Sequence, residues 1–256
     1  MDISQIIGDS FEYAKKLFSD LGKLVILVVL NIIPIVNLIV VGYQTRVAKG
    51  TPTSNQPPPL GDYGDLFVQG LKVAIAIFLY MLVPMILIVL GVFSFIPPMT
   101  GIRMLFPIAM GIGLLALGIL LAFCIGTIAA MAIVHMVKND SFGKAFAASE
   151  ILQIIGKVGW GKYIIWLIVT SVISMAVGAL GSIPLIGWIL SLIVSPVLGV
   201  FTMRSAALIY SEAIPTAATP PAPPLVGVAS AVKYCANCGA QMPADAAFCS
   251  NCGGKQ

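Results

Sequence analysis

The chain has 256 residues, of which 59% are hydrophobic and 9% are charged. Because soluble domains carry about 25% charged residues, this composition excludes a protein whose whole surface faces water. The formal net charge of +4 is small, and in a membrane protein it matters mainly through where the cations lie. We therefore expect an integral membrane protein with most of its surface in lipid.

The first 20 residues predict an amphipathic helix. Charged residues lie largely off one apolar face, so we expect the helix to lie on the membrane surface; a solvent-exposed helix packed on the protein is the alternative. No signal peptide is expected, because the first apolar run starts near Leu24 after a polar lead and no small-residue cleavage site follows it. The apolar residues at helical spacing are Ile3, Ile6, Ile7, Phe11, Ala14, Leu17, Phe18 and Leu21.

Strongly apolar runs follow at residues 24–43, 68–95, 105–136, 160–181 and 185–203. Spanning a bilayer needs about 20 apolar residues, and the last four runs meet that length. The first run holds Asn31, Pro34 and Asn37 near its middle, which is unusual for a simple span. We predict an all-α polytopic membrane protein with four or five transmembrane helices besides the interfacial helix.

A weak internal repeat bears on the first run. DSFEYA at 9–14 resembles DSFGKA at 140–145, and Ile-Pro recurs at 33–34 and 183–184. If the repeat is real, Pro34 lies in the turn of a short hairpin. Its legs rise only ~15–18 Å at about 1.5 Å per residue, half a bilayer, so the hairpin would be re-entrant.

The 14 lysines and arginines distinguish the two topologies. If the first run crosses, four cations lie on one side and ten on the other; if it is re-entrant, Arg103 lies apart from the other thirteen. We favour the re-entrant topology because its asymmetry is cleaner. Both topologies predict a multi-pass protein of the plasma membrane with a cytosolic C-terminal tail.

Two cysteine pairs close the chain, in YCANCGAQMPADAAFCSNCGGKQ. Cys235 and Cys238, then Cys249 and Cys252, form two tight knuckles whose four thiolates suit tetrahedral Zn²⁺. Four cysteine ligands leave no position for water or substrate, so the zinc would be structural, replacing a core that about 20 residues cannot build. A disulfide or an iron site is the alternative, and a reducing cytosol disfavours the disulfide.

Composition therefore divides the chain into four parts. Residues 1–20 form the interfacial helix, and residues 21–212 form a multi-span helical membrane domain in which 50–65 is a proline-rich loop. Residues 213–232 are a Pro/Ala-rich linker, semi-extended because of its prolines. Residues 233–256 form the zinc ribbon.

Two apolar runs carry a small residue at every fourth position, which lets a neighbouring helix approach closely. We interpret both as packing faces within one chain; a homo-oligomer face or a substrate groove is the alternative. The two sets are Gly118, Ala122, Gly126 and Ala130, then Gly187, Ser191, Ser195 and Gly199.

Ionisable residues avoid the middle of the apolar runs. No acidic residue lies there, and only Lys72 and His135 come near, both toward the ends of runs. Ion-coupled transporters and acid–base catalysts need such groups. We therefore predict no enzyme and no catalytic or cofactor-binding residues, and we interpret Cys124 as a packing residue.

Two resemblances follow from these motifs. The tail resembles the zinc-ribbon module C-x-x-C-G…F-C-x-x-C-G, with Gly239, Phe248 and Gly253 beside the four cysteines. Residues from about 9 to 212 resemble an archaeal and bacterial membrane-protein family, the domain of unknown function four-zero-one-three, through IIPIVNLIVVGYQTRVAKG, PPPLGDYGDLFVQGLK and SFGKAFAASEIL. That resemblance implies a multi-span helical fold, often with such a tail, and no activity.

The expected function is a membrane-anchored scaffold whose zinc ribbon recruits a cytosolic protein partner through the surface from Ala236 to Phe248. The alternative is a channel or transporter for a neutral or apolar solute, lined by groups such as Asn31, Gln69 and Thr127. Nucleic acid is not an expected partner, because the tail has no basic cluster. The lipid bilayer is the other expected partner, and small-residue faces could support a homo-oligomer.

Overall fold

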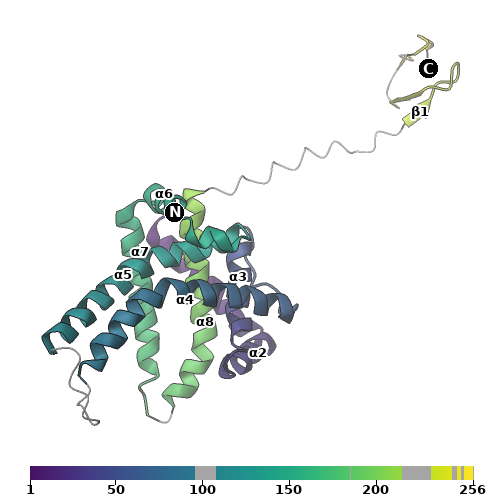
Figure 1. Cartoon of the computed structure of the whole chain (residues 1–256). Coiled ribbons are helices and arrows are strands. Elements are labelled where there is room, and N and C mark those ends of the chain that lie inside the picture. The colour runs from purple at the N-terminus through teal and green to yellow at the C-terminus, as the bar shows by residue number, and fades with distance from the viewer. Residues whose placement is uncertain (96–107, 185, 215–231, 244–246, 249–250, 256) are drawn as a thin grey trace. The chain divides into compact units, whose positions relative to one another are not determined.

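The computed structural model describes residues 1–95, 108–184, 186–214, 232–243, 247–248 and 251–255 (Figure 1). The chain divides into two compact units, Met1–Ile214 and Pro215–Gln256. The first unit is helical, and the second carries a small two-stranded sheet. The first unit therefore contains the predicted membrane domain together with the predicted N-terminal helix, and most of the predicted linker lies outside the described residues.

Eight α-helices and two short 3-10 helices make up the described part of the first unit. Their order explains the architecture, since two long hairpins alternate with shorter amphipathic elements. The elements are α1 (Ile3–Lys15), η1 (Lys16–Ser19), α2 (Leu21–Ile32), α3 (Leu38–Gly50), α4 (Tyr63–Phe93), α5 (Ile108–Lys138), η2 (Phe142–Phe146), α6 (Ala148–Val158), α7 (Trp160–Leu180) and α8 (Gly187–Ala213).

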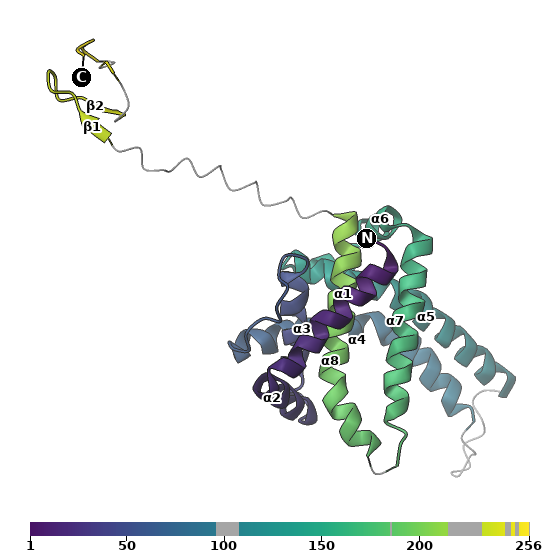
Figure 2. The ribbon, with the colours of Figure 1, turned by 180° about the vertical axis from the view of Figure 1, so that it is seen from behind.

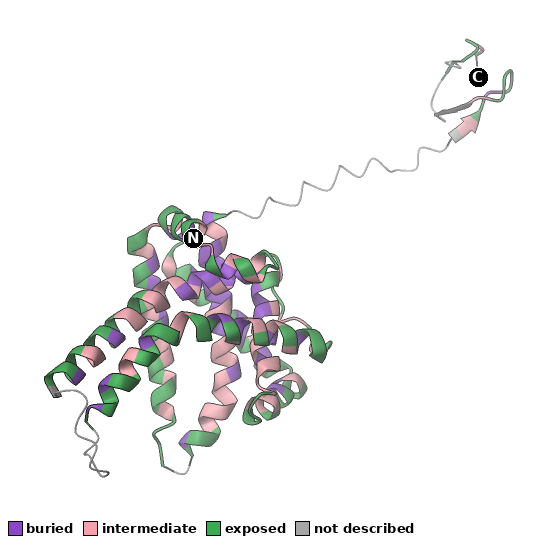
Figure 3. Cartoon of the chain, in the orientation of Figure 1, coloured by how far each residue is buried: buried purple, intermediate pink, exposed green. Residues whose placement is uncertain are grey.

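Four described helices are long and apolar enough to cross a membrane, which confirms the predicted polytopic helical class. They are Tyr63–Phe93, Ala109–Lys138, Trp160–Leu180 and Gly187–Ala213. In the first three, at most 28% of the most apolar stretch is buried, whereas half of that stretch is buried in α8. Figure 3 shows buried residues gathered around α8 and exposed ones along the outer parts of α4 and α5.

The first apolar run folds as two short helices rather than one span. α2 and α3 have 12 and 13 residues, or roughly 18–20 Å each, too short to cross a hydrocarbon core of about 30 Å. The turn between them places Ile35 at φ 73°, a left-handed conformation that β-branched residues rarely adopt. Asn31 in α2 donates to Ser195 Oγ of α8 at 2.8 Å, so its amide is bound within the protein.

The proposed repeat recurs in the order of elements but not in its DSF motif. An amphipathic helix precedes a helical hairpin twice, as α1 before α2 and α3 and as α6 before α7 and α8. Residues 9–14 lie within α1, whereas residues 140–145 cover a turn and η2. The DSF motif therefore does not mark structurally equivalent positions.

The N-terminal helix packs on the protein and also keeps an apolar exposed side. Asp2 and Gln5 form a capping box that fixes where α1 begins. Figure 2 shows α1 lying across α8, and Ile6 and Leu17 are fully buried in this part of the unit. Phe11 is 61% exposed on the same helix. Helical periodicity thus predicted α1 correctly, while its tertiary contacts are visible only in the fold.

Small residues bring helices together inside the chain. A Cβ on Gly118 would meet the side chains of Leu87 and Ile88 in α4, and one on Gly199 would meet Gln44 in α3. Ser195 of the second set accepts a hydrogen bond from the Asn31 side-chain amide. Both small-residue faces are thus occupied by helices of the same chain, as interpreted from their spacing.

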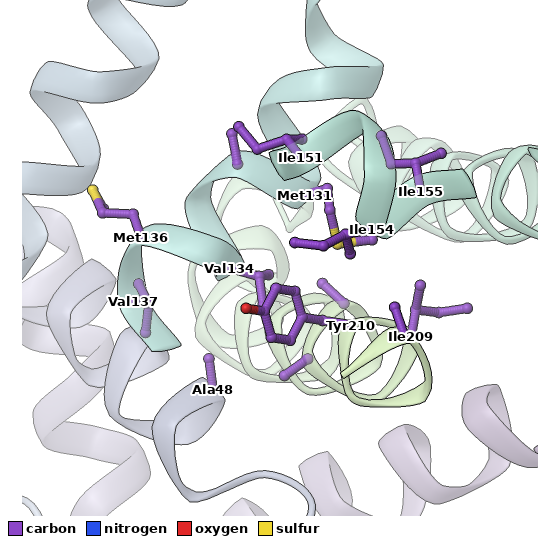
Figure 4. Close-up of a cluster of buried hydrophobic side chains, with 14 of the residues drawn as sticks. Ala48, Met131, Val134, Met136, Val137, Ile151, Ile154, Ile155, Ile209 and Tyr210 are labelled. Carbon is purple, nitrogen blue, oxygen red and sulfur yellow. The ribbon is translucent and has the colours of Figure 1, made fainter. Parts of the chain in front are cut away.

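The largest hydrophobic cluster lies where α5, α6 and α8 meet (Figure 4). Met131 from α5, Ile154 from α6 and Ile209 from α8 are at most 4% exposed. This cluster fixes the ends of three helices against one another. Polar side chains, among them His135 and Glu150, lie at this same end of the unit.

Candidate functional site

The tail folds around a short hairpin whose connection carries the first cysteine pair. Strand β1 (Val232–Tyr234) pairs antiparallel with β2 (Gln241–Pro243), so Tyr234 lies opposite Gln241. The Cys235 N–H donates to Ala240 O at 2.9 Å and closes the first knuckle. Gly239 has φ 71°, the left-handed conformation that its position after the second cysteine of the pair predicts.

Three of the four predicted metal ligands come together in this tail. The Sγ atoms of Cys235, Cys238 and Cys252 all lie within 4.8 Å of one another. Cys235 Sγ and Cys252 Sγ are 3.6 Å apart. A tetrahedron with Zn–S bonds of about 2.3 Å has edges of about 3.8 Å, so this spacing suits a Zn(Cys)₄ centre. The fourth predicted ligand, Cys249, lies outside the described residues.

Backbone groups favour the thiolate form of Cys235. The Asn237 N–H donates to Cys235 Sγ at 3.4 Å. This bond and a second one from the Cys238 backbone lower the pKa of the Cys235 thiol to about 6. Since metal ligands must be deprotonated, the knuckle is preorganised for a cation. Gly253, after the second pair, has φ 70°, so a glycine in the left-handed conformation follows each cysteine pair.

Two aromatic side chains lie on the surface of the ribbon. Tyr234 is 67% exposed and Phe248 is 62% exposed. Phe248 also forms an isolated β-bridge with Lys255, which holds its backbone in place. A large apolar side chain that the fold does not bury is a candidate contact for another molecule.

A buried arginine organises one end of the membrane unit. Arg204 in α8 is 1% exposed, and its Nε donates to Asp9 Oδ1 of α1 at 2.8 Å. Its Nη1 donates to Ser54 O at 2.7 Å and to Thr51 Oγ1 at 3.3 Å. Its guanidinium lies 4.4 Å from the Tyr13 ring centroid, a cation–π contact. Arg204 thus joins α8 to α1 and to the loop after α3.

The helix that carries Arg204 runs past the end of the predicted apolar run. Only Lys72 and His135 were expected near the membrane interior, because the last apolar run was taken to end at residue 203. α8 instead continues to Ala213, so Arg204 lies inside a candidate span and is paired there. The apolar residues after it, Ala206 to Tyr210, were the signal for a longer helix.

His135 belongs to a second polar network at the same end. Its Nδ1 lies 2.9 Å from the Tyr210 hydroxyl, and its Nε2 lies 3.0 Å from Glu150 Oε2. Lys144 Nζ donates to both Glu150 carboxylate oxygens at 2.7 and 2.8 Å. Hydrogen bonds from Lys144 first, then from His135, lower the pKa of Glu150. These groups join α5, α6 and α8 where Asn139 adds a bond to His135 O.

The polar residues considered for a solute path do not converge. Asn31 bonds to Ser195, Gln69 donates to Asp65 at 3.3 Å, and Thr127 donates to Cys124 O at 2.7 Å. Each lies in a different helix and has a different local partner. Residue types suited to such a path could thus be named from the sequence, but these three side chains do not meet at one place.

Four hydroxyl side chains are among the residues that line a largely apolar cavity of about 470 Å³ between α5, α7 and α8. Thr170, Ser171, Ser174 and Thr202 line it. Thr170, Ser174 and Thr202 each donate to a backbone carbonyl of their own helix. Trp166 also lines the cavity, and its Nε1 is buried without a hydrogen-bond partner among the described residues. No single helix carries all of these residues, so no pattern along the sequence indicates that they meet.

Each of the two units of the chain matches the model of a known protein family. Residues 234–255 match a zinc-ribbon domain. No curated protein and no solved structure matches the chain. Residues 26–186, which include three of the four apolar helices, match a family described as Protein of unknown function (DUF4013), and this confirms the resemblance seen in the sequence. Because this match covers more than half of the 256 residues, the chain belongs to the DUF4013 family.

Proposed function

We propose that this protein is a membrane-anchored scaffold whose zinc ribbon recruits a cytosolic protein partner. The observation that carries the proposal is the pair of exposed aromatic side chains, Tyr234 and Phe248, on a unit held together by its cysteine cluster. Aromatic side chains are enriched among the residues that dominate protein–protein binding energy. The proposal assigns no reaction to the chain and no nucleic acid to the ribbon.

Zinc is the cation that best fits the ribbon, and its proposed role is structural. The three sulfurs at the described knuckles, with Cys249 as the fourth ligand, would occupy all four positions of a tetrahedral ion. Such an ion has no open position for water or substrate. Zinc would therefore set the shape of the surface that carries Tyr234 and Phe248 rather than perform chemistry.

The positions of the cations support the proposal that the tail lies on the cytosolic side of the plasma membrane. Lys49 near the end of α3 pairs with Asp140, and Lys138 at the end of α5 donates to Thr51 O. Lys162 at the start of α7 pairs with Glu212 at 2.6 Å, close to the end of α8. These helix ends therefore share one basic end of the unit, where α8, the last helix before the linker, also ends. Cytosolic loops carry an excess of lysine and arginine, so this end is proposed to be cytosolic.

The proposed side can be tested with single cysteines at Ser4, Ser54 and Ser230 in a chain lacking its native cysteines. A membrane-impermeant maleimide should label none of them in intact cells and all three after the membrane is opened. Labelling of Ser230→Cys in intact cells would place the tail outside and overturn the recruitment proposal. Labelling of Ser4→Cys alone would instead show that the first apolar run crosses the membrane.

Recruitment itself is tested by crosslinked pull-down of the full chain from cells. Tyr234→Ser combined with Phe248→Ser should lose a protein that the unmodified chain captures, while the variant keeps its bound zinc. Lys255→Ser, a change at another exposed ribbon position, is the matched control and should capture the protein normally. If the double variant captures the same protein in the same amount, the aromatic surface is not the recruiting surface.

A second candidate function, a channel or transporter for a neutral or apolar solute, is favoured by the cavity lined by Thr170, Ser171, Ser174 and Thr202. Hydroxyl groups can replace part of a neutral solute's hydration without any charge. Proteoliposomes should then admit glycerol faster than empty vesicles, and Ser171→Phe should abolish the difference. Equal rates for protein-containing and empty vesicles would reject this function for glycerol-like solutes.

A further inference from the structure

An apolar groove of about 800 Å³ lies between α1 and the hairpin of α7 and α8. Phe11 and Phe18 form its wall on the N-terminal side, and Ile173 and Val197 belong to its wall on the hairpin side. Its size is within the range of about 300–1,000 Å³ that is typical of ligand sites. The groove is distinct from the cavity near Trp166, which lies among α5, α7 and α8.

The groove has the depth of one leaflet of a bilayer. Its lining on α7 extends from Val169 to Val177, a rise of roughly 12 Å at 1.5 Å per residue. The hydrocarbon core of a bilayer is about 30 Å thick, so the chains of one leaflet extend about 15 Å. Because α7 and α8 are candidate spans, the molecule best placed to fill an apolar groove along them is a lipid chain.

A cation lies at the rim of the groove. Lys15 lines it and is exposed, and its ammonium group makes no hydrogen bond or ion pair with the part of the chain that the structure describes. Its neighbour Lys16 instead donates to Asn55 O at 2.6 Å, and Lys23 pairs with Asp20. An apolar groove with a cation at its rim matches a molecule that has an apolar chain and an anionic head.

We propose that this groove binds one acyl chain of an anionic phospholipid and that Lys15 pairs with the lipid phosphate. The chain would fill the space beside Phe11 and Phe18, while the phosphate stays at the surface of the membrane unit. Basic pockets between membrane helices on the cytoplasmic side are suited to anionic lipid headgroups. The bound lipid would join α1 to α7.

Gly8 gives a way to block the groove without crowding the protein. It lines the groove, and an added Cβ would meet no atom within 4 Å. Leucine there would place its side chain where the acyl chain is proposed to lie, and leucine suits a helix better than glycine. Gly113→Leu in α5 is the matched control, because Gly113 is also exposed with open space around it and does not line the groove.

The test uses the delipidated full chain in detergent, with dioleoylphosphatidylglycerol or dioleoylphosphatidylcholine added and retained lipid counted by native mass spectrometry. The unmodified chain should bind one phosphatidylglycerol about fivefold more tightly than phosphatidylcholine, the factor expected for one lysine near an anionic head. Lys15→Gln should remove this preference. Gly8→Leu should weaken both lipids at least fivefold, and Gly113→Leu should change neither.

Circular dichroism and thermal unfolding of each variant establish that it is folded before lipid is added. Equal binding of the two lipids by the unmodified chain would overturn the pairing with Lys15, as would a preference that survives Lys15→Gln. Unchanged binding by folded Gly8→Leu would overturn the groove as the site. Preferential retention of a lipid that carries no anionic head would also overturn the proposal.

Discussion

The two units of this chain achieve order by different means. The membrane unit buries large side chains from many helices, including Tyr43, Tyr163 and Arg204, each at most 1% exposed. In the tail, Cys235 is buried, and the other side chains whose burial is described, at 233–234, 236–240, 247–248 and 251–255, are half-buried or exposed. A unit with a large hydrophobic core can therefore stay folded after a single substitution, whereas a unit without such a core depends on its metal ligands to stay folded.

Polar contacts in the two units differ in the same way. In the membrane unit, Arg204 and His135 connect helices whose apolar faces already pack together. In the tail, the contacts to Cys235 and Cys252 come from nearby backbone and from Asn237, and no apolar cluster supports them among the described residues. Perturbations of equal chemical size should therefore have very unequal consequences.

The largest effect is expected from removing the metal ligands of the tail. Cys238→Ser should unfold the ribbon, because binding of a structural zinc contributes about 10–16 kcal/mol in small zinc units. Elemental analysis should find one zinc per unmodified chain and much less in the variant. Limited proteolysis should cut the variant tail while leaving Met1–Ile214 intact.

Cys124→Ser is the control for this comparison, because Cys124 lies in α5 and outside the cysteine cluster. It should keep one zinc per chain and a protected tail. A zinc content near zero in unmodified protein that was purified without chelators would contradict the metal assignment. A membrane unit that unfolds together with the Cys238→Ser tail would contradict the independence of the two units.

The next largest effect is expected at Arg204. Arg204→Leu should destabilise the membrane unit by about 3 kcal/mol, the lower end of the cost of breaking a buried ion pair, because Asp9 is only partly buried. Arg46→Leu is the matched control from the corresponding end of α3. Its partner Asp65 is half exposed, so the loss should stay within about 1 kcal/mol. Reversible unfolding in mixed micelles measures both, and equal losses would contradict the central role of Arg204.

Sequence patterns predicted the elements of the fold well where one physical rule dominates. Apolar length alone located the four long helices, and helical periodicity located α1. Pro34 between Asn31 and Asn37 correctly indicated that the first run is interrupted. The end of α8 was placed too early, because Arg204 reads as a boundary until its partner Asp9 is known.

The candidate sites were predictable to different degrees for a related reason. Cysteine spacing specifies a local knuckle, so Cys235, Cys238 and Cys252 could be named as neighbours from sequence alone. The cavity beside Trp166 and the groove beside Phe11 depend on how separate helices cross. Crossing geometry follows from many small contacts, and no short motif records it.

A smaller effect is expected at the turn of the α2–α3 hairpin, and its sign depends on whether lipid or water surrounds the turn. Ile35 is 71% exposed and has positive φ, where asparagine is favoured over a β-branched residue by about 1 kcal/mol. If the turn lies in water, Ile35→Asn should stabilise the membrane unit by about that amount. If the hairpin is re-entrant, an amide in lipid should outweigh this gain and destabilise the unit by about 1–2 kcal/mol.

We expect the destabilising result, because Ile32 and Ile33 beside the turn are also exposed and apolar. Unfolding of Ile35→Asn in lipid bicelles gives the sign, and Ile35→Gly shows the effect of relieving the backbone without adding a polar side chain. Stabilisation by asparagine in bicelles would contradict a re-entrant hairpin.

The smallest expected effect is the pH dependence contributed by Glu150. Its pKa is lowered in the folded protein by hydrogen bonds from Lys144 and His135, so its ionised form stabilises the fold. That stabilisation is present above the unfolded pKa of a glutamate, about 4.3, and is lost as the pH falls through the lower folded pKa. The effect should be small because the Glu150 side chain is 44% exposed and solvent screens the pair.

Thermal unfolding between pH 7 and pH 3 should show a slightly steeper loss of stability for the unmodified chain than for Glu150→Gln, which has no charge to lose. Since both proteins share every other carboxylate, the difference between their curves isolates this contact, and parallel curves would show that Glu150 adds nothing to the acid sensitivity of the membrane unit.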